Sequence, residues 1–169
     1  MLAIGSDASL LTGGMIAVEF KHPSSGNYSL DLHIFNASWS ITIGGNGAWD
    51  MNNLHHYAIV YDVNATNNAD AGKIYVDGTL MQITYWNDPH TINLTAAGEI
   101  VIGKSPNNKD VYHYQGIIKK LKIWNTIRSE LEIQSSYGNS DDSYLNNIIS
   151  SQTYENGLLL YIPMNQNNH

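Results

Sequence analysis

Apolar and polar residues alternate along much of this chain. The segment Met15–Phe20 has an apolar residue at every second position, and Tyr28–Phe35 and Ser38–Ile43 follow the same pattern. Alternation with a period of two is typical of antiparallel strands that bury one side and expose the other to water. The pattern therefore predicts three strands, and the glycine-rich cluster Gly44–Gly47 is expected to end the series.

Similar reasoning predicts six further strands: His55–Asp62, Gly72–Val76, Leu80–Trp86, Glu99–Gly103, Gln115–Trp124 and Gly157–Pro163. Between two of them stands Asp77-Gly78, which predicts a tight hairpin because both turn positions accept positive φ. The segment Val63–Ala71, rich in Asn and Ala, is expected to be an exposed loop. Strands spaced in this way predict an all-β fold in which two antiparallel sheets form a sandwich.

Short helices are expected only near the C-terminus. Ser129 and Glu132 have the spacing of a capping box, in which the two side chains satisfy the first amides of a helix. Gly138 is a suitable terminator for that helix. A second short helix is predicted over Asp142–Ser150.

The order of these segments resembles a known family. The segments His55–Asp62, Lys73–Gly78 and Gly116–Asn125 look like strands of the laminin-G-like, or concanavalin A-like, jelly roll, which also includes the pentraxins. Arg128–Ile133 is similar to the family's helix, and Leu158–Asn165 is similar to its closing strand. The family's opening strand is not recognisable in residues 1–14, so no strand is predicted there.

The resemblance implies one laminin-G-like domain over residues 1–169, used as a module of a larger protein. It further implies a non-catalytic recognition module outside the cell or exposed on a surface, with lectin-like carbohydrate binding or cell adhesion. The alternative is a structural or protein–protein interaction module in a larger extracellular or virion surface assembly, such as a filament or fibre. Both alternatives stay open, and both imply a glycan or an extracellular protein as partner.

Composition narrows the possible partners. The 169 residues include eight Lys and Arg against fifteen Asp and Glu, a net charge of −7, and no cysteine. An acidic chain is a poor match for nucleic-acid phosphates. Without cysteine it has neither disulfides nor a thiol nucleophile. No apolar run reaches the roughly 18 residues that a membrane-spanning helix needs, so direct membrane insertion is not expected.

Glycosylation and catalysis find little support in the sequence. Four Asn-X-Ser/Thr sequons are about what chance produces in so Asn-rich a chain: Asn27, Asn36, Asn64 and Asn93. No glutamate has a second carboxylate two positions away along an expected strand, as a glycosidase of this fold class would need. There is no Gly-X-Ser-X-Gly elbow either. We therefore expect no enzyme.

The candidate sites are aromatic and amide-rich segments. Aromatic rings stack on sugars, and amides and carboxylates bind hydroxyls, so the predicted ligand-binding residues are Trp49, Trp86, Asn87, Asp88, Tyr112 and Tyr114. Oxygen ligands suit Ca²⁺, and calcium-binding relatives such as pentraxins carry a Glu-Gln-Asp cluster at the equivalent loop. The calcium hypothesis therefore falls on Asn107, Asn108 and Asp110. The alternatives are core aromatics and an ordinary polar loop.

Two adjacent histidines, His55 and His56, could suggest zinc. Neighbouring residues of a strand point to opposite sides, however, so they cannot easily share one ion. In the family that this chain resembles, the pair is structural, and we expect the same here.

Overall fold

The structure is a computed structural model of the whole chain. It describes residues 2–5, 15–21, 29–35, 39–44, 53–62, 64–82, 84–86, 99–103, 114, 116–138 and 156–163. The chain forms two compact units. The first comprises Met1–Leu54, Ile59–Ile74 and Leu80–Gln115, and the second comprises His55–Ala58, Tyr75–Thr79 and Gly116–His169. That the whole chain is one domain stays a prediction.

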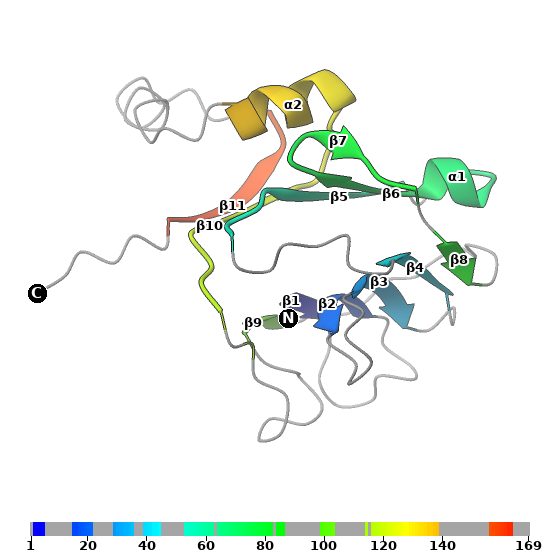
Figure 1. The fold of residues 1–169 in the computed structure, drawn as a ribbon. Helices are drawn as coiled ribbons and strands as arrows, with labels where there is room; N and C mark the ends of the chain where they lie inside the picture. The colour runs from blue at the N-terminus through cyan, green and yellow to red at the C-terminus, as the bar shows by residue number, and fades with distance from the viewer. Residues whose placement is uncertain are drawn as a thin grey trace, which may run out of the picture. The chain divides into compact units, whose positions relative to one another are not determined.

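A six-stranded sheet lies in the first unit (Figure 1). Across the sheet the strands are β8 (Thr84–Trp86), β4 (Trp39–Gly44), β3 (Ser29–Phe35), β2 (Met15–Lys21), β1 (Leu2–Gly5) and β9 (Glu99–Ile102). Every neighbouring pair is antiparallel. The strands predicted from alternation at β2, β3, β4 and β9 are confirmed to within about two residues at each end.

Strand register gathers the apolar positions on one face of this sheet. Leu30 of β3 lies opposite Phe20 of β2 and Ile43 of β4. Its own side chain is fully buried. The buried Leu30 therefore marks this face as the core side of the sheet. Burial of apolar surface stabilises the folded state by about 25 cal/mol per Å². The polar positions of the same strands share the other face, because side chains alternate along a strand.

The N-terminal strand was not predicted. β1 pairs with β2 from Leu2↔Val18 to Gly5↔Met15, and its other edge pairs with β9. The sequence pattern does not reveal this strand, and the structure places it at the N-terminus. Four residues are too few to show a period of two, and β1 is stabilised by backbone hydrogen bonds to partners far along the chain.

A three-stranded sheet joins β5 (Tyr57–Tyr61), β6 (Gly72–Val76) and β7 (Thr79–Leu80). The β6–β7 turn is Asp77-Gly78, with φ of 50° and 76°, so the predicted hairpin is confirmed. The predicted continuous strand Leu80–Trp86 is wrong. This segment first pairs with β6 and then pairs with β4, so it forms two strands, β7 and β8.

The connection before β6 also differs from the prediction. The helix α1 (Asn68–Ala71) occupies the end of the expected exposed loop, and Ala71 is fully buried. Asn67 begins this turn: its side-chain oxygen accepts a hydrogen bond of 3.0 Å from the Asp70 amide. Asn and Asp favour such local turns, which composition alone does not distinguish from an irregular loop.

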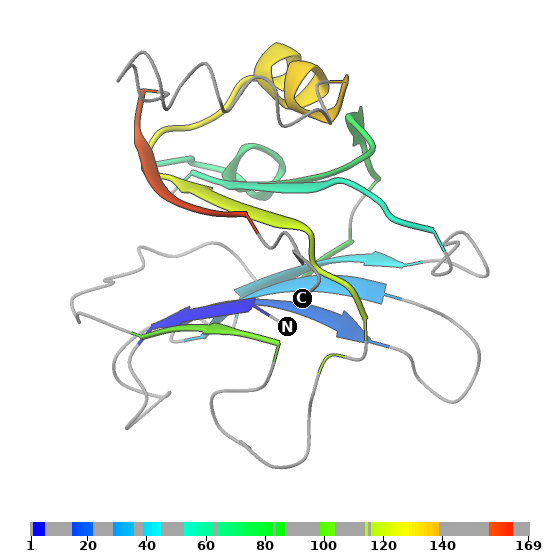
Figure 2. The ribbon, with the colours of Figure 1, turned by 90° about the vertical axis from the view of Figure 1, so that its left-hand side faces the viewer.

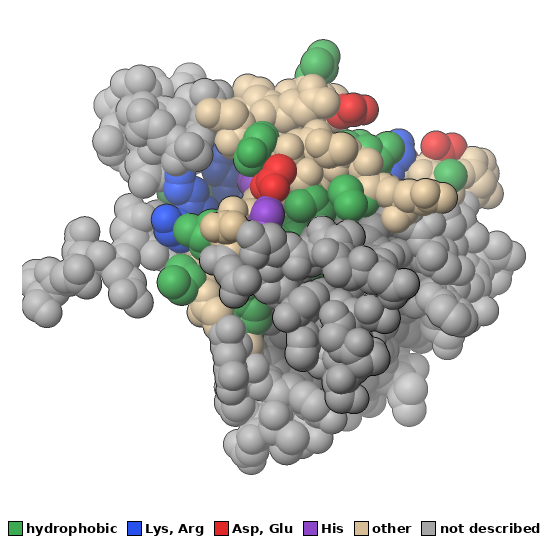
Figure 3. All heavy atoms as spheres, in the orientation of Figure 1, with side chains coloured by type: hydrophobic (Ala, Val, Ile, Leu, Met, Phe, Trp, Pro, Cys, Tyr) green, Lys and Arg blue, Asp and Glu red, His purple; other side chains and the backbone are tan. Residues whose placement is uncertain are grey.

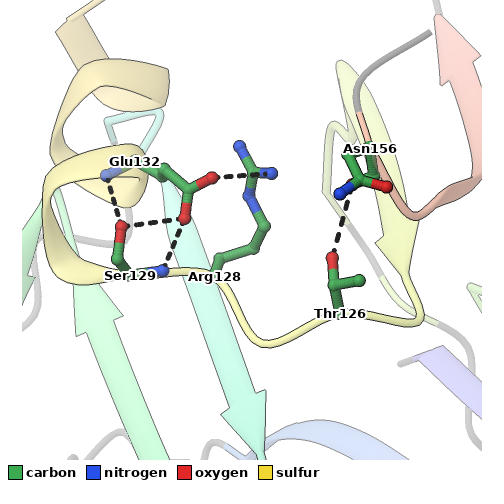
Figure 4. A network of polar contacts seen from close by, with 5 residues as sticks. All are labelled: Thr126, Arg128, Ser129, Glu132 and Asn156. Atoms are coloured by element: carbon green, nitrogen blue, oxygen red, sulfur yellow. Dashed lines mark hydrogen bonds and ion pairs between the residues drawn. The ribbon is translucent and has the colours of Figure 1, made fainter.

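The second unit contains the antiparallel pair β10 (Lys120–Trp124) and β11 (Leu158–Pro163), and the helix α2 (Glu130–Gly138). Figure 2 shows the two strands side by side. β10 begins later than the predicted start at residue 115. The capping box is confirmed: the Ser129 amide and hydroxyl donate to Glu132 Oε2 at 2.7 and 2.8 Å (Figure 4). The predicted helix Asp142–Ser150 lies outside the described residues.

Candidate functional site

Most of the predicted site residues lie outside the described residues. This holds for Trp49, Asn87, Asp88 and Tyr112 among the ligand-binding candidates, and for Asn107, Asn108 and Asp110 of the calcium hypothesis. Trp86 and Tyr114 are described. Trp86 directly precedes the candidates Asn87 and Asp88, and Tyr114 follows the predicted calcium loop.

Trp86 is the last residue of β8, at one edge of the six-stranded sheet. It lies opposite Ser40 of β4, and Ser40 lies opposite His33 of β3. These three positions form a row across the strands on the polar face of the sheet. Adjacent strands are about 4.8 Å apart, so the backbone of Trp86 lies one strand spacing from that of Ser40.

A second polar row lies two residues further along the same strands. Thr84 lies opposite Thr42, Thr42 opposite Asp31, and Asp31 opposite Glu19. Positions two residues apart on a strand share a face, so the register places both rows on the same face of the sheet. We call these seven residues the polar sheet face: Glu19, Asp31, His33, Ser40, Thr42, Thr84 and Trp86.

The sequence pattern does not reveal the pairing of Glu19 with Asp31. A glycosidase of this fold class would be expected to carry two carboxylates along one strand, whereas these two lie on neighbouring strands in register. Directly opposite positions have Cβ atoms roughly 5 Å apart, and like charges there are destabilising. The signal was present in the alternation of both strands, but only the register reveals the pair.

Tyr114 closes the base of the predicted calcium loop. Its amide donates a 2.7 Å hydrogen bond to the Gly103 carbonyl, and Gly103 has a φ of 82°. Gly103 and Tyr114, which flank the predicted calcium loop, therefore lie side by side at the end of β9. Asn107, Asn108, Asp110 and Tyr112 all fall within this closed segment.

Strand order separates the two candidate segments. β8 and β9 are the opposite edges of the sheet, five strand spacings or roughly 24 Å apart along it. Five antiparallel pairings also make them run in opposite directions, so the chain leaves Trp86 and Ile102 toward opposite ends. The sheet therefore does not bring Trp86 together with the loop after β9. The segment that leads to Trp49 leaves β4 at the same end as that loop, because four pairings separate β4 from β9.

His55 and His56 contact Asp77 through different groups. His55 Nδ1 lies 2.7 Å from Asp77 Oδ2, while the His56 amide donates to Asp77 Oδ1 at 2.9 Å. The Asp77 amide in turn donates to the His56 carbonyl at 2.8 Å. The contacts hold the turn after β6 against the start of β5, as a structural role requires. Among the described residues no group of three or more His, Cys, Asp or Glu could hold a metal ion.

The surroundings shift the pKa of both groups in this cluster. Burial acts to raise the pKa of Asp77, but the hydrogen bonds from His55 and His56 outweigh it, and the pKa is lowered below 3.8. Burial lowers the pKa of His56 below 6.5, and Lys122 lowers it further against the opposing effect of Asp77. Asp77 is therefore held as a carboxylate and His56 as a neutral ring.

A cluster of cations and aromatic rings covers one side of β10 and β11. Lys122 Nζ lies 5.6 Å from the Trp124 ring and 5.9 Å from the Tyr161 ring. The Arg128 guanidinium lies 5.2 Å from the Trp124 ring. Blue side chains gather on one part of the described surface in Figure 3. Two cationic side chains, Lys122 and Arg128, thus lie close to the Trp124 ring. This packing is the reason that Trp124 is not among the candidate sugar-binding residues.

No described helix is long and apolar enough to span a membrane. A family model described as "Concanavalin A-like lectin/glucanases superfamily" (Laminin_G_3) matches residues 3–134. No curated protein and no solved structure matches this sequence. The fold of the matched family is an all-β sandwich, which confirms the predicted fold class. Because the match covers more than half of the chain, this protein belongs to the laminin-G-like family within the concanavalin A-like lectin and glucanase superfamily.

Proposed function

We propose that this protein is a non-catalytic, lectin-like module that binds carbohydrate outside the cell. Members of its superfamily are in general carbohydrate-binding or adhesion modules. The observation that carries the proposal is the polar sheet face, where Trp86 shares a surface with two rows of hydrogen-bonding residues. An indole can stack on the apolar face of a sugar ring, while carboxylates and hydroxyls bind its hydroxyl groups.

The charge of this face indicates a neutral sugar. Glu19 and Asp31 lie in register on neighbouring strands, and Lys21 shares the face of Glu19 on β2. The two carboxylates outnumber the one lysine, so a further negative group from a sulfated or acidic glycan would add repulsion. Sugar hydroxyls instead donate hydrogen bonds to carboxylates, and hydrogen bonds with charged partners are the stronger kind. We therefore expect neutral glycans to bind in preference to anionic ones.

A glycan array followed by calorimetry tests the proposal. Trp86→Ala is expected to abolish binding with little change in melting temperature, and Asp31→Ala to weaken it by about tenfold, which corresponds to one lost hydrogen bond of about 1.4 kcal/mol. Trp86→Phe keeps an aromatic face and retains part of the affinity. Leu131→Ala, on the surface of α2, is the control and leaves binding unchanged. Absence of glycan binding in the unmodified protein would reject the proposal.

Hydrolysis is the outcome that would contradict the non-catalytic part. Retaining glycosidases place two carboxyl groups about 5–5.5 Å apart, and the register of Glu19 and Asp31 does not exclude such a spacing. Chromatography of a bound oligosaccharide after prolonged incubation is expected to recover it intact. Appearance of cleaved products that Glu19→Gln removes would make the protein a hydrolase.

A second candidate is a structural or protein–protein interaction module in a larger extracellular or virion surface assembly. It is favoured by large apolar side chains that the second unit exposes: Leu131 is 77% exposed, Ile117 70% and Leu159 63%. Exposed apolar side chains mark protein interfaces in other proteins where they lie together. Concentration-dependent assembly, lost on Leu131→Asp and accompanied by no glycan binding, would support this candidate over the lectin.

A further inference from the structure

The side chain of His56 is half-buried, and its Nδ1 atom is buried. This atom makes no hydrogen bond to any group in the described part of the chain. The ring packs against the Tyr137 ring of α2, with 6.0 Å between centroids and an angle of 41° between planes. A buried polar atom without a partner is costly and is uncommon in folded proteins, so this contact calls for an explanation.

The same helix lies directly over the Asp77-Gly78 turn. A Cβ atom at Gly78 would lie 3.4 Å from Gln134 Cα and 3.4 Å from Tyr137 Cδ1. Ile133, on the same helix, is only 4% exposed. The turn, the His56 ring and α2 thus form one packed contact within the second unit, which we call the turn–helix contact.

Charged groups around the His56 ring compensate a positive charge there only in part. Asp77 favours the charged ring, but less than burial disfavours it, and its carboxylate already accepts hydrogen bonds from the His55 ring and the His56 backbone amide. Lys122 repels a charged ring. On α2 itself, Glu132 is bonded to Ser129 and paired with Arg128, and Glu130 accepts a hydrogen bond from Gln134. A protonated ring would therefore carry a buried Nδ1–H that has no acceptor in the described part of the chain.

We propose that protonation of His56 releases α2 from the Asp77-Gly78 turn, which makes the turn–helix contact a pH-sensitive switch. The neutral ring holds Tyr137 and the helix in place. The buried Nδ1–H of a charged ring is hydrated only if the ring leaves its site, and the departure of the ring removes the support of Tyr137. Acidification would thus open α2 while the Ser129 cap, which involves other groups, keeps the helix itself formed.

The direction of the effect follows from proton linkage. The folded-state pKa of His56 lies below 6.5, so between that pKa and 6.5 the open state binds more protons than the closed state. Acidification through this range favours the open state, and the closed contact is fully formed above it. In this range the opening equilibrium rises by up to about tenfold per pH unit.

Hydrogen exchange of the intact protein measures this opening. Amides of Ile133, Gln134 and Tyr137 are expected to lose protection, after correction for the intrinsic pH dependence of exchange, as the pH falls from about 7.5 to about 5. The rest of the described chain should keep its protection over this range. Constant protection of α2 across the range overturns the proposal.

Two variants test the role of His56. His56→Phe keeps a ring against Tyr137 but cannot be protonated, so the protection of α2 should become independent of pH. Leu131→Ala, at an exposed position of the same helix, is the control and should retain the loss of protection. If His56→Phe shows the same acid opening as the unmodified protein, the proposal fails.

A direct titration covers the case in which His56→Phe does not fold. The ring resonances of His56 in the unmodified protein, followed by NMR, should titrate with a midpoint below 6.5 and together with the shifts of the Tyr137 ring. A midpoint at or above that value, or a Tyr137 ring that does not respond, overturns the proposal.

Discussion

Glu132 satisfies several groups at the start of α2. Its Oε2 atom accepts hydrogen bonds from the amide and the hydroxyl of Ser129, and Oε1 pairs with Arg128 at 2.9 Å. The hydrogen bond from the Ser129 amide is the largest cause of a lowered pKa for Glu132, followed by that from the hydroxyl. The first turn of the helix therefore depends on one serine and the residue three positions later.

The cap predicts the effect of one substitution. Ser129→Ala removes the hydroxyl and is expected to lower the free energy of unfolding by about 1 kcal/mol, as N-cap replacements do. Urea unfolding followed by circular dichroism measures the change. Ser129→Thr, which keeps a hydroxyl, is the matched control and should stay near the unmodified value. Equal loss in both variants would contradict a role for the hydroxyl.

Gly157 is required for two reasons. Its φ is 79°, a conformation that costs a residue with Cβ about 1–2 kcal/mol. A Cβ atom there would also overlap the side chain of Thr126, whose hydroxyl donates to the Asn156 carbonyl at 3.3 Å (Figure 4). The turn into β11 and the segment after β10 thus approach too closely for any side chain.

Gly157→Ala is accordingly expected to destabilise the protein by about 2 kcal/mol or more. Thermal unfolding measures the loss. Gly138→Ala is the control, because no heavy atom lies within 4 Å of a Cβ at that position. The double variant Gly157→Ala with Thr126→Gly removes the overlap with Thr126 and should recover part of the loss, although Asn125 Oδ1 still lies 2.8 Å from the added Cβ. No recovery would assign the cost to backbone conformation and the remaining contact with Asn125.

At the scale of elements, the β6–β7 turn is held by charge as well as by backbone shape. Asp77 and Gly78 both have positive φ, and the Asp77 carboxylate bonds His55 and the His56 amide. The turn therefore connects β6 to the start of β5. Sequence predicted the turn from the backbone preference alone, whereas the carboxylate contacts follow from the pairing of the two strands.

Asp77→Asn tests this charge through its pH dependence. The folded-state pKa of Asp77 lies below 3.8, so the contact stabilises the protein above that pH and is lost as the pH falls through the folded-state pKa. At about pH 7 the variant should lose about 1 kcal/mol, while near pH 2.5 the difference should be smaller. Urea unfolding at both pH values measures it. An equal difference at both would rule out the carboxylate as the cause.

At the scale of the molecule, strand order distributes the candidate sites. The polar sheet face includes the β8 edge, whereas the predicted calcium loop follows β9 at the other edge. Loss of one site should therefore leave the other intact. Within the sheet, β1 connects β2 to β9, so the position of the loop depends on a strand that is far from it in sequence.

Calcium binding by Asn107, Asn108 and Asp110 remains a hypothesis with a simple test. If the loop binds calcium, millimolar calcium should raise the melting temperature over an EDTA control, and the stabilisation should approach about 2.7 kcal/mol at about one hundred times Kd. Asp110→Asn should remove the shift, and Trp86→Ala should leave it unchanged. The same melting temperature in calcium and EDTA would dismiss calcium as a cofactor.

The sequence alone determined the local features of this protein. Alternation marked β2, β3 and β4, the Asp77-Gly78 dipeptide marked a hairpin, and Ser129 with Glu132 marked the start of α2. Each of these signals acts between residues that are close in the chain, through strand alternation, turn φ angles and helix capping. Local physics is therefore readable without knowledge of the fold.

Only the tertiary structure decided which distant residues meet. The insertion of β1 between β2 and β9, the register that sets Glu19 opposite Asp31, and the separation of Trp86 from the loop after β9 all depend on strand pairing. A shift of one residue in register would move every side chain of a strand to the other face. Pairing results from the summed burial and hydrogen bonding of whole strands, and no short segment of sequence contains that sum.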